Sequence, residues 1–277
     1  MIPVEKPKWS TSVIGCWSEW EAVGKRLIPY LPYRYVNQPT VSIELNHNPD
    51  VSRRFVIFDM FDTLVKLRSD IGRYEILEVL HRIYLQEYDF DDVRTLYDEI
   101  VDRLVSERRS DNLEVVFVEI LEYIFDGLGI SGHDLAEVED RVFHGSDFVS
   151  HMPGAKDTLR FFKENGYKVA VLSNSYFLES TLVRCFKNLG LYDLIDEVVS
   201  SADILYMKPR KEAYDAVLER IGAEASEAFF AGDNPLNDYD GPKSHGMTPI
   251  HIHLKGDSRD LSVRSIGEIP SLFVANE

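Results

Sequence analysis

A regular alternation of strand-like and helix-like segments after Pro153 is the feature that most constrains the fold. Short apolar runs alternate there with stretches of helical periodicity, and glycines end several of the helical stretches. Strands that alternate with helices in this way form βαβ units, whose strands lie parallel in one sheet. The sequence therefore predicts an α/β fold with a Rossmann-like parallel sheet. We expect its strands at 168–172, 197–200, 228–231 and 249–253, and its helices at 155–165, 179–189, 211–221 and 238–245.

One more strand precedes this series, and a block of helices separates it from the others. The run FVIF at 55–58 is apolar throughout, which is typical of a buried parallel strand. Between this strand and Pro153, apolar residues recur at helical spacing, and four amphipathic helices with short connections indicate a small inserted bundle. We expect these helices at about 73–88, 93–105, 113–125 and 134–143, with Asp111 and Glu114 as a capping pair before the third.

The chain is accordingly expected to have three parts. The α/β core comprises 55–68 and 151–277, and the inserted helical domain comprises 69–150. Residues 1–54 form an N-terminal extension of unknown role, in which 41–45 alternate as in a short half-buried strand. We expect the extension to lie against the core or to form a homodimer contact.

Polar side chains stand where the inner strands of the expected sheet end. Ligands of open α/β sheets bind at the carboxyl ends of the strands, so these side chains should meet on one edge. They combine a possible nucleophile, a phosphate-binding pair and a cation site. The strand-end residues are Asp59, Asp62, Ser173, Asn174, Lys208, Asp233 and Asp238.

Four segments around these residues resemble the motifs of the haloacid dehalogenase (HAD) superfamily. Each short motif alone occurs by chance, whereas four in the right order, each after an expected strand, make a strong joint signal. The resemblance covers about 55–275, and the helical insertion is similar to the C1-type cap of this superfamily. The four segments are FDMFDTL (58–64), VLSNS (171–175), MKP (207–209) and AGDNPLND (231–238).

The resemblance implies a magnesium-dependent hydrolase in which Asp59 attacks phosphorus and forms an aspartyl-phosphate. A carboxylate is a weak nucleophile that an anionic substrate repels, and Mg²⁺ removes this obstacle by bridging it to the phosphate oxygens. Asp233 and Asp238 would hold the ion together with Asp59. The backbone carbonyl of Phe61 would be a further ligand, as the equivalent group is in the family.

Three other strand-end residues would handle the phosphoryl group. The resemblance implies that Ser173 and Lys208 bind it and neutralise its charge during transfer, and that Asn174 belongs to the same binding site. Lys208 would also offset the crowded carboxylates. A site closed by a cap favours a small phosphorylated metabolite as the substrate. We expect the cap to close over the core about hinges at 66–69 and 150–153.

The match breaks at Phe61. The family's phosphatases usually carry there a second Asp, two residues after the nucleophile, which serves as general acid and base. The second carboxylate here is Asp62, one residue further on, and we count it among the candidate catalytic residues. Either a reshaped loop brings Asp62 to the leaving group, or His144 or His151 supplies the proton, or the enzyme is not a phosphomonoesterase. Loss of this group costs typically about 10²–10⁴-fold in rate.

Two alternatives to a phosphatase follow. The 2-haloacid dehalogenases of the same fold also lack the second Asp, use their nucleophile on carbon and need no metal. Asp233 and Asp238 argue against this reading, because two carboxylates repel a carboxylate substrate unless a cation lies between them. A catalytically impaired binding protein is the other alternative, but a scaffold has no need for charges crowded on one edge.

Composition limits the partners and the compartment. A net charge of −17 repels phosphate backbones, so we expect no nucleic acid among the partners. No run approaches the roughly 20 apolar residues that span a bilayer, and the first residues do not resemble a secretory signal. The two cysteines, Cys16 and Cys185, cannot form a disulfide framework. We therefore expect a cytoplasmic protein.

Overall fold

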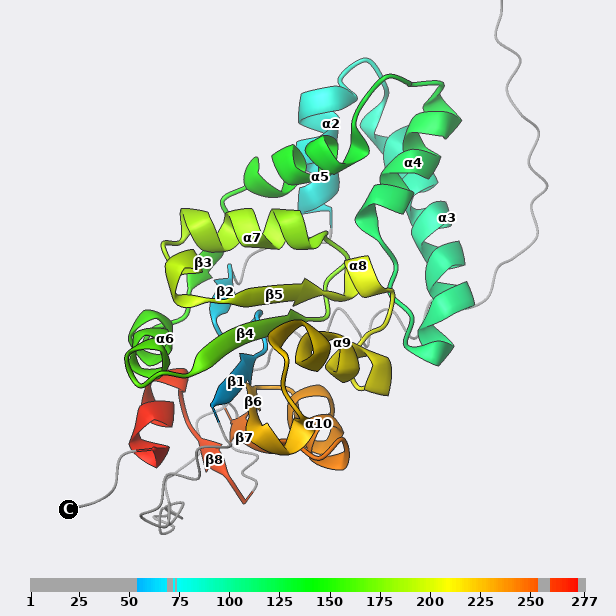
Figure 1. Ribbon diagram of the computed structural model, residues 1–277. Helices are drawn as coiled ribbons and strands as arrows, with labels where there is room; N and C mark the ends of the chain where they lie inside the picture. Colours follow the sequence, from blue (N-terminus) through cyan, green and yellow to red (C-terminus); the bar gives the residue numbers. More distant parts are fainter. Residues whose placement is uncertain (1–53, 69–71, 73, 254–259, 274–277) are drawn as a thin grey trace, which may run out of the picture. The chain divides into compact units, whose positions relative to one another are not determined.

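The computed structural model describes residues 54–68, 72, 74–253 and 260–273 (Figure 1). All of them belong to one compact unit, Val41–Glu277. The strand expected at 41–45 and the role expected for 1–54 lie outside the described residues. None of the described helices is long and apolar enough to cross a membrane.

The main sheet has six strands in the order β5-β4-β1-β6-β7-β8, and every neighbouring pair is parallel. This confirms the predicted α/β class. The strands predicted at 55–58 and 197–200 coincide with observed ones, the other three differ by one residue at one or both ends, and β8 was not predicted. The strands are β1 (Phe55–Phe58), β4 (Lys168–Ser173), β5 (Glu197–Ser200), β6 (Ala228–Gly232), β7 (Thr248–Ile252) and β8 (Ser262–Val263).

Helices bury both faces of this sheet. Side chains alternate along β1, so Val56 and Phe58 join a cluster that includes Phe162 of α6, while Ile57 joins a second cluster that includes Val217 of α9. Burial on both sides explains why β1 is apolar at every position. The main helices are α6 (Ala155–Glu164), α7 (Glu179–Asn188) and α9 (Lys211–Ile221), with short helices α8 (Ser201–Ile204), η2 (Tyr192–Leu194), η3 (Ala225–Glu227) and η5 (Ile266–Leu272).

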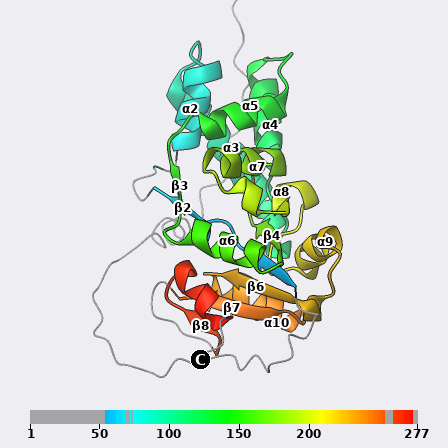
Figure 2. The ribbon, with the colours of Figure 1, turned by 60° about the vertical axis from the view of Figure 1, so that its left-hand side comes forward.

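The helical insertion follows β1 and precedes β4, as predicted. Its helices are enclosed by β2 (Val65–Leu67) and β3 (Val149–His151), which form a two-stranded antiparallel sheet at the expected hinges. Figures 1 and 2 both show the insertion beside α7 and away from β8. Its assignment as a separate cap domain stays a prediction. The helices are α2 (Glu75–Tyr84), α3 (Phe90–Arg108), η1 (Arg109–Asp111), α4 (Phe117–Leu128) and α5 (Leu135–His144).

The capping pair predicted for the third cap helix is wrong. Helix α4 begins at Phe117, and no side chain caps it. Asp111 lies in η1, and the buried Glu114 accepts a hydrogen bond from Ser201 Oγ at 2.5 Å. The helix expected to span 73–88 is likewise shorter, because α2 ends at Tyr84. Tertiary contacts outweigh the local capping pattern here.

Those contacts are backbone hydrogen bonds between the cap and the segment that leads to Lys208. Leu113 forms an antiparallel bridge with Tyr206, and the Met207 N–H donates to Asn112 O at 2.9 Å. Glu114 N also donates to Leu205 O at 3.1 Å, so the backbone of 113–114 is paired with this segment of the core, whereas Asn112 lies in a turn with φ of 51°. The helical insertion, which we call the cap after its predicted role, is thus attached to the core here as well as through β2 and β3.

Candidate active site

Lys208 lies between the carboxylates of Asp59, which follows β1, and Asp238, which follows β6. Its ammonium donates to Asp59 Oδ1 and to Asp238 Oδ1, each at 2.7 Å, and its side chain is 1% exposed. The Asn174 side chain accepts from Lys208 N at 2.7 Å and donates to Lys208 O at 2.9 Å. Asn174 therefore holds the Lys208 backbone from both of its polar groups. A cis peptide bond joins Lys208 to Pro209.

A tight loop presents Asp59 at the end of β1. The Asp59 N–H donates to Ala231 O at 2.9 Å, which ties the start of the loop to β6. The Val65 N–H then returns to Met60 O at 2.8 Å, so the chain reverses within a few residues. Asp62 occupies the left-handed region with φ of 60°, a conformation that Asp tolerates better than most residues.

The end of β6 positions the other two carboxylates. Asn234 caps the next turn, a π-helical segment η4 (Pro235–Asp240) that runs into α10 (Gly241–Ser244) and replaces the single helix expected at 238–245. Asp238 bends back, and its Oδ2 accepts from Asn234 N at 2.9 Å. A Cβ at Gly232 would lie 2.5 Å from the Asp238 carboxylate, so only glycine permits this approach.

Asp59, Asp233 and Asp238, which we call the carboxylate cluster, come together around this point. Each offers an oxygen within 4.8 Å of the others. Burial raises the pKa of Asp233 to about 8, and the charges of Asp59, Asp238 and Asp62 add to the effect. Burial also raises the pKa of Asp238 to about 6, against the opposing charge of Lys208. Burial and mutual repulsion thus disfavour the ionised forms of these carboxyl groups, and a bound cation would favour the ionised forms.

Lys208 keeps its charge in this environment. Burial lowers the pKa of its ammonium, but the charges of Asp238 and Asp59 outweigh burial and leave the pKa above its ordinary value. Its single positive charge cannot balance three carboxylates. The donors of the cluster are all oxygens, which suit a hard divalent cation such as Mg²⁺. The residues therefore fit the predicted magnesium site, in which the Phe61 carbonyl stays a predicted ligand.

Two buried hydroxyls near the nucleophile have no hydrogen-bond partner among the described residues. Ser173, at the end of β4, is 1% exposed, and Thr63, in the loop after Asp59, is fully buried. An unpaired buried hydroxyl costs about 1–3 kcal/mol, which a bound ligand can recover. Ser173 was predicted from its strand end. Thr63 was not, although it lies in the same short segment as Asp59.

The three candidates for proton transfer lie in different surroundings. The charge of Asp62 raises the pKa of Asp233, so Asp62 lies close to the carboxylate cluster. His144 lies 3.5 Å from Asp140 of its own helix α5 and 3.2 Å from Asn188 of α7, so its contacts are with these helices rather than at the cluster. His151 is exposed and pairs with Val65 across β2 and β3. Of the three, Asp62 is the one whose charge reaches the cluster.

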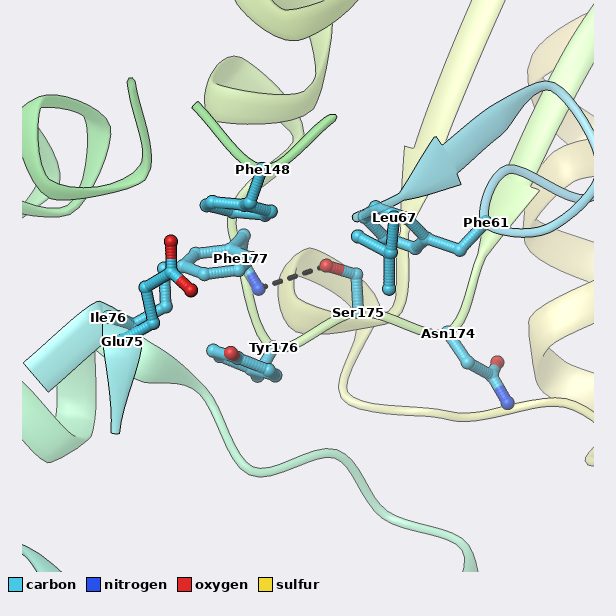
Figure 3. A pocket seen from close by; sticks show the side chains of 9 residues that line it. All are labelled: Phe61, Leu67, Glu75, Ile76, Phe148, Asn174, Ser175, Tyr176 and Phe177. Atoms are coloured by element: carbon cyan, nitrogen blue, oxygen red, sulfur yellow. Dashed lines mark hydrogen bonds between the residues drawn. The ribbon is translucent and has the colours of Figure 1, made fainter. Parts of the chain in front are cut away.

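A cavity of about 230 Å³ adjoins the site, and Asn174 and Ser175 form part of its wall (Figure 3). Glu75, at the start of α2, also lines it. Its other lining residues are apolar, and periodicity along the sequence could not show that they face one space. We call this cavity the aromatic pocket. Its apolar and aromatic lining residues are Phe61, Leu67, Ile76, Phe148, Tyr176 and Phe177.

A parallel α/β sheet with a carboxylate, a serine, a lysine and two more carboxylates at its strand ends defines a HAD-like hydrolase. Residues 54–246 match the family model described as haloacid dehalogenase-like hydrolase. This match spans more than half of the chain. The protein belongs to the HAD-like hydrolases.

Proteins named for two different chemistries are similar to this chain. An (S)-2-haloacid dehalogenase 4A of Burkholderia cepacia is 26% identical over 242 residues, which cover 81% of this chain and 96% of that protein. Phosphatase MT3486 of Mycobacterium tuberculosis is 31% identical over 129 residues, which cover 46% of this chain and 57% of that protein. Pyrophosphatase PpaX of Bacillus cereus is 24% identical over 65% of this chain and 74% of that protein.

Solved structures show the same division. A 2-haloacid dehalogenase from Pseudomonas syringae superposes with a TM-score of 0.58 at 21% identity, covering 80% of this chain and 98% of that one. A HAD phosphatase from Thermococcus onnurineus gives a TM-score of 0.53 at 21% identity, covering 79% of this chain and 97% of that one. At this identity the similarity establishes the fold, and the choice between chemistries depends on the site itself.

Proposed function

We propose that this protein is a magnesium-dependent phosphatase that acts on a small phosphorylated metabolite through an aspartyl-phosphate on Asp59. The observation that carries the proposal is the carboxylate cluster, in which Asp59, Asp233 and Asp238 offer oxygens within 4.8 Å of one another. Lys208 supplies one positive charge to this group. The remaining negative charge calls for a divalent cation before an anionic substrate can enter.

Asp59, Asp233 and Asp238 would hold the ion, with the carbonyl of Phe61 as the further predicted ligand. Bound Mg²⁺ would neutralise charge on the carboxylates and on the phosphoryl oxygens. The fit rests on the donor set, since carboxylate and carbonyl oxygens are the ligands that Mg²⁺ prefers.

The protein's own residues would perform the transfer. An oxygen of Asp59 attacks phosphorus in line, the bond from phosphorus to the leaving oxygen breaks, and Asp59 becomes an acyl phosphate. Water then attacks this phosphorus and releases inorganic phosphate and the free carboxylate. Lys208 and the unpaired hydroxyl of Ser173 bind the phosphoryl oxygens during both steps. Asn174 acts through Lys208 by holding its backbone in place.

The leaving oxygen also needs a proton. Asp62 is our candidate, because its charge reaches the carboxylate cluster. It occupies the position after Phe61, where glycine is common in the family. Turnover slower by a factor of up to about 10²–10⁴ is expected if Asp62 does not serve.

A dehalogenase reaction at carbon is the second candidate, supported by Phe61 and by the relative in Burkholderia cepacia. It requires the site to accept a carboxylate substrate without a metal. Three crowded carboxylates, two of them buried, oppose that substrate, so the phosphatase is the better supported reaction. A binding protein without activity leaves the crowding of Asp59, Asp233 and Asp238 unexplained.

Hydrolysis of 4-nitrophenyl phosphate, with Mg²⁺ and with excess EDTA, tests the proposal. We expect release of phosphate that depends on Mg²⁺ and falls by at least about 10³-fold in Asp59→Asn, as for removal of a nucleophile. Asp157→Asn is the matched control, because its side chain is 83% exposed. Release of chloride from 2-chloropropionate that EDTA does not reduce, without phosphatase activity, would replace this proposal with the dehalogenase.

The partners, cellular location and oligomeric state of the protein are also proposals. A net charge of −17 supports a partner list without nucleic acid or an anionic membrane surface. A cytoplasmic location and a homodimer contact through residues 1–54 stay predictions. Size-exclusion chromatography with light scattering, on the full chain and on a chain without 1–54, tests the dimer.

A further inference from the structure

The aromatic pocket shares a wall with the active site. Asn174 lines the pocket and holds the backbone of Lys208, whose ammonium lies 2.7 Å from Asp59 Oδ1. Phe61 lines the same pocket and lies two residues after Asp59 in the loop that carries the nucleophile. A group attached to phosphorus at Asp59 therefore has the pocket beside it.

Aromatic rings form much of the lining, and other rings hold them in place. The Phe177 ring lies 4.7 Å from that of Phe143, and the Phe148 ring 5.0 Å from the same Phe143, both edge to face. The Tyr176 ring lies 4.3 Å from that of Phe177, yet Tyr176 is 38% exposed. A fixed apolar surface thus faces the space beside the nucleophile.

We propose that the aromatic pocket binds the leaving group of the substrate, and that this group is a single aromatic ring on a short link with a hydrogen-bond donor at its far end. The inference rests on the proposed phosphatase function and names its substrate class. A sugar phosphate fits poorly, because its hydroxyls would lose hydrogen bonds to water and gain few from these side chains.

The size of the cavity limits the leaving group to one ring. Its volume is about 230 Å³. An engineered cavity of about 150 Å³ lined by apolar side chains binds benzene, whereas pockets for drug-sized ligands begin at about 300 Å³. One ring with a link of one or two carbons fills the space.

Glu75 supplies the polar contact at the far end. Figure 3 shows Glu75 and Asn174 on opposite sides of the pocket, with the rings between them. Arg68 donates to Glu75 Oε1 at 2.7 Å. The other carboxylate oxygen, Oε2, makes no hydrogen bond with the described residues. Glu75 is 17% exposed, so a donor on the ligand can reach a largely shielded acceptor.

Two esters of primary alcohols with similar leaving groups test the ring. We expect kcat/KM for 2-phenylethyl phosphate to exceed that for glucose 6-phosphate by at least about tenfold, the scale of discrimination by an apolar pocket. Tyr176→Ala should reduce kcat/KM for 2-phenylethyl phosphate about tenfold and leave ethyl phosphate, which does not reach the ring, within twofold. Tyr192→Ala is the control, since Tyr192 is 36% exposed and lies outside the pocket.

A hydroxyl on the ring tests the far end. We expect 2-(4-hydroxyphenyl)ethyl phosphate to be preferred over 2-phenylethyl phosphate about tenfold, as for a hydrogen bond to a charged acceptor, and Glu75→Ala to remove the preference. Glu78→Ala is the control, because both acids lie in the first turn of α2 and Glu78 is exposed.

The outcomes separate this inference from the proposed function. If turnover depends on Asp59 and Mg²⁺ but glucose 6-phosphate is preferred over 2-phenylethyl phosphate, the inference is wrong and the proposed phosphatase function is unaffected. Absence of any turnover that depends on Asp59 overturns the phosphatase. Calorimetry with Asp59→Asn and Mg²⁺ measures the affinity of the pocket for these esters without turnover. Equal affinities for 2-phenylethyl phosphate and glucose 6-phosphate also overturn the inference.

Discussion

Two groups of buried or half-buried carboxylates stand out among the described residues, and their surroundings differ. Asp59, Asp233 and Asp238 meet at the strand ends, where they share the single charge of Lys208. The other group consists of Glu114 and Glu139, which reach from the cap to the core. Glu114 accepts from Ser201 Oγ and from Val115 N. Glu139 accepts from N–H and O–H donors through Oε1, while its buried Oε2 has no hydrogen-bond partner among the described residues.

Glu139 shows how the second group works. It is fully buried in α5, and its Oε1 accepts from Leu178 N and from Thr181 Oγ1, both at 2.8 Å. These donors lie at the start of α7, where Leu178 itself provides no side-chain cap. A carboxylate near a helix N-terminus is also favoured by the helix dipole. Glu139, which lies in the inserted helical domain, thus caps the N-terminus of α7 in the core.

The contrast shows that burial of a carboxylate does not by itself indicate chemistry. An isolated acid with hydrogen-bond donors serves to join two parts of the structure. Acids that crowd one another around an ammonium leave a charge to be neutralised, which is a property of a binding site. The predictions below test this distinction, first at the strand ends and then at the cap.

Lys208→Met should have the largest effect. It removes the positive charge from between Asp59 and Asp238, so we expect kcat to fall by about 10²–10³-fold, as when a charge-stabilising donor is lost. The free energy of unfolding without Mg²⁺ should fall by about 3–5 kcal/mol, because buried acids lose their partner. Steady-state rates and urea unfolding measure the two effects. Lys211→Met, at a side chain that is 71% exposed, is the control.

Magnesium should stabilise the folded protein through the carboxylate cluster. At a concentration one hundred times its dissociation constant, Mg²⁺ should add about 2.7 kcal/mol to the free energy of unfolding. Asp233→Asn should remove most of this gain, because it deletes one of the three acids, whereas Asp157→Asn should leave it intact. Thermal unfolding with and without Mg²⁺ measures the difference. An equal gain in both variants would place the cation elsewhere.

The strand-end group could be predicted from the sequence because its signals are local. Asp59 and Asp233 directly follow apolar strands and Ser173 ends one, and parallel topology brings such ends to one edge. Lys208 follows β5 less closely, after α8, and its place depended on the family motif. The structure places Asp59 and Asp238 on either side of Lys208, and the roles of all these residues stay predictions.

The cap contacts could not be predicted because they join residues far apart in the chain. Asp111 and Glu114 have the spacing of a capping pair, yet Glu114 contacts Ser201, 87 residues away. Nothing in the local pattern distinguishes these two outcomes. The aromatic pocket has the same origin, since Phe148 and Tyr176 come from segments whose meeting depends on the whole fold.

Glu139→Gln should change the pH dependence of stability. Burial raises the pKa of Glu139 to about 7, with Asp203 and Asp140 adding to it and the hydrogen bonds from Thr181 and Leu178 opposing it. The folded state therefore holds a proton that the unfolded chain releases above its own pKa of 4.5. The contribution of this group to stability is full at low pH and declines as pH rises towards 7.

Glutamine keeps the acceptor and cannot lose a proton, so the variant should gain stability relative to the parent protein across that window. The gain should be on the order of 2 kcal/mol by pH 8. Urea unfolding between pH 5 and pH 8 measures it. Glu137→Gln, at an exposed position in the same helix, should show no such trend. A difference between Glu139→Gln and the parent that does not vary with pH would contradict the expectation.

Glu114→Gln should have the smallest effect and should show it mainly in substrate affinity. Glu114 Oε2 accepts from Ser201 Oγ at 2.5 Å, and Ser201 Oγ in turn accepts from Ser175 N at 2.8 Å in the wall of the aromatic pocket. Its Oε1 accepts from Val115 N at 3.1 Å. Glutamine has one oxygen for these two donors, so one hydrogen bond is lost, at a cost of about 1 kcal/mol.

Because this chain of hydrogen bonds ends at the pocket and not at Asp59, Glu114→Gln should raise KM for 2-phenylethyl phosphate a few-fold and change kcat less than twofold. Ethyl phosphate should show neither change. Glu119→Gln, in α4 and paired with Arg108 at 2.6 Å, is the matched control for a lost carboxylate in the cap. A fall in kcat for both esters would mean that Glu114 supports the nucleophile as well, and that the two carboxylate groups are coupled rather than distinct.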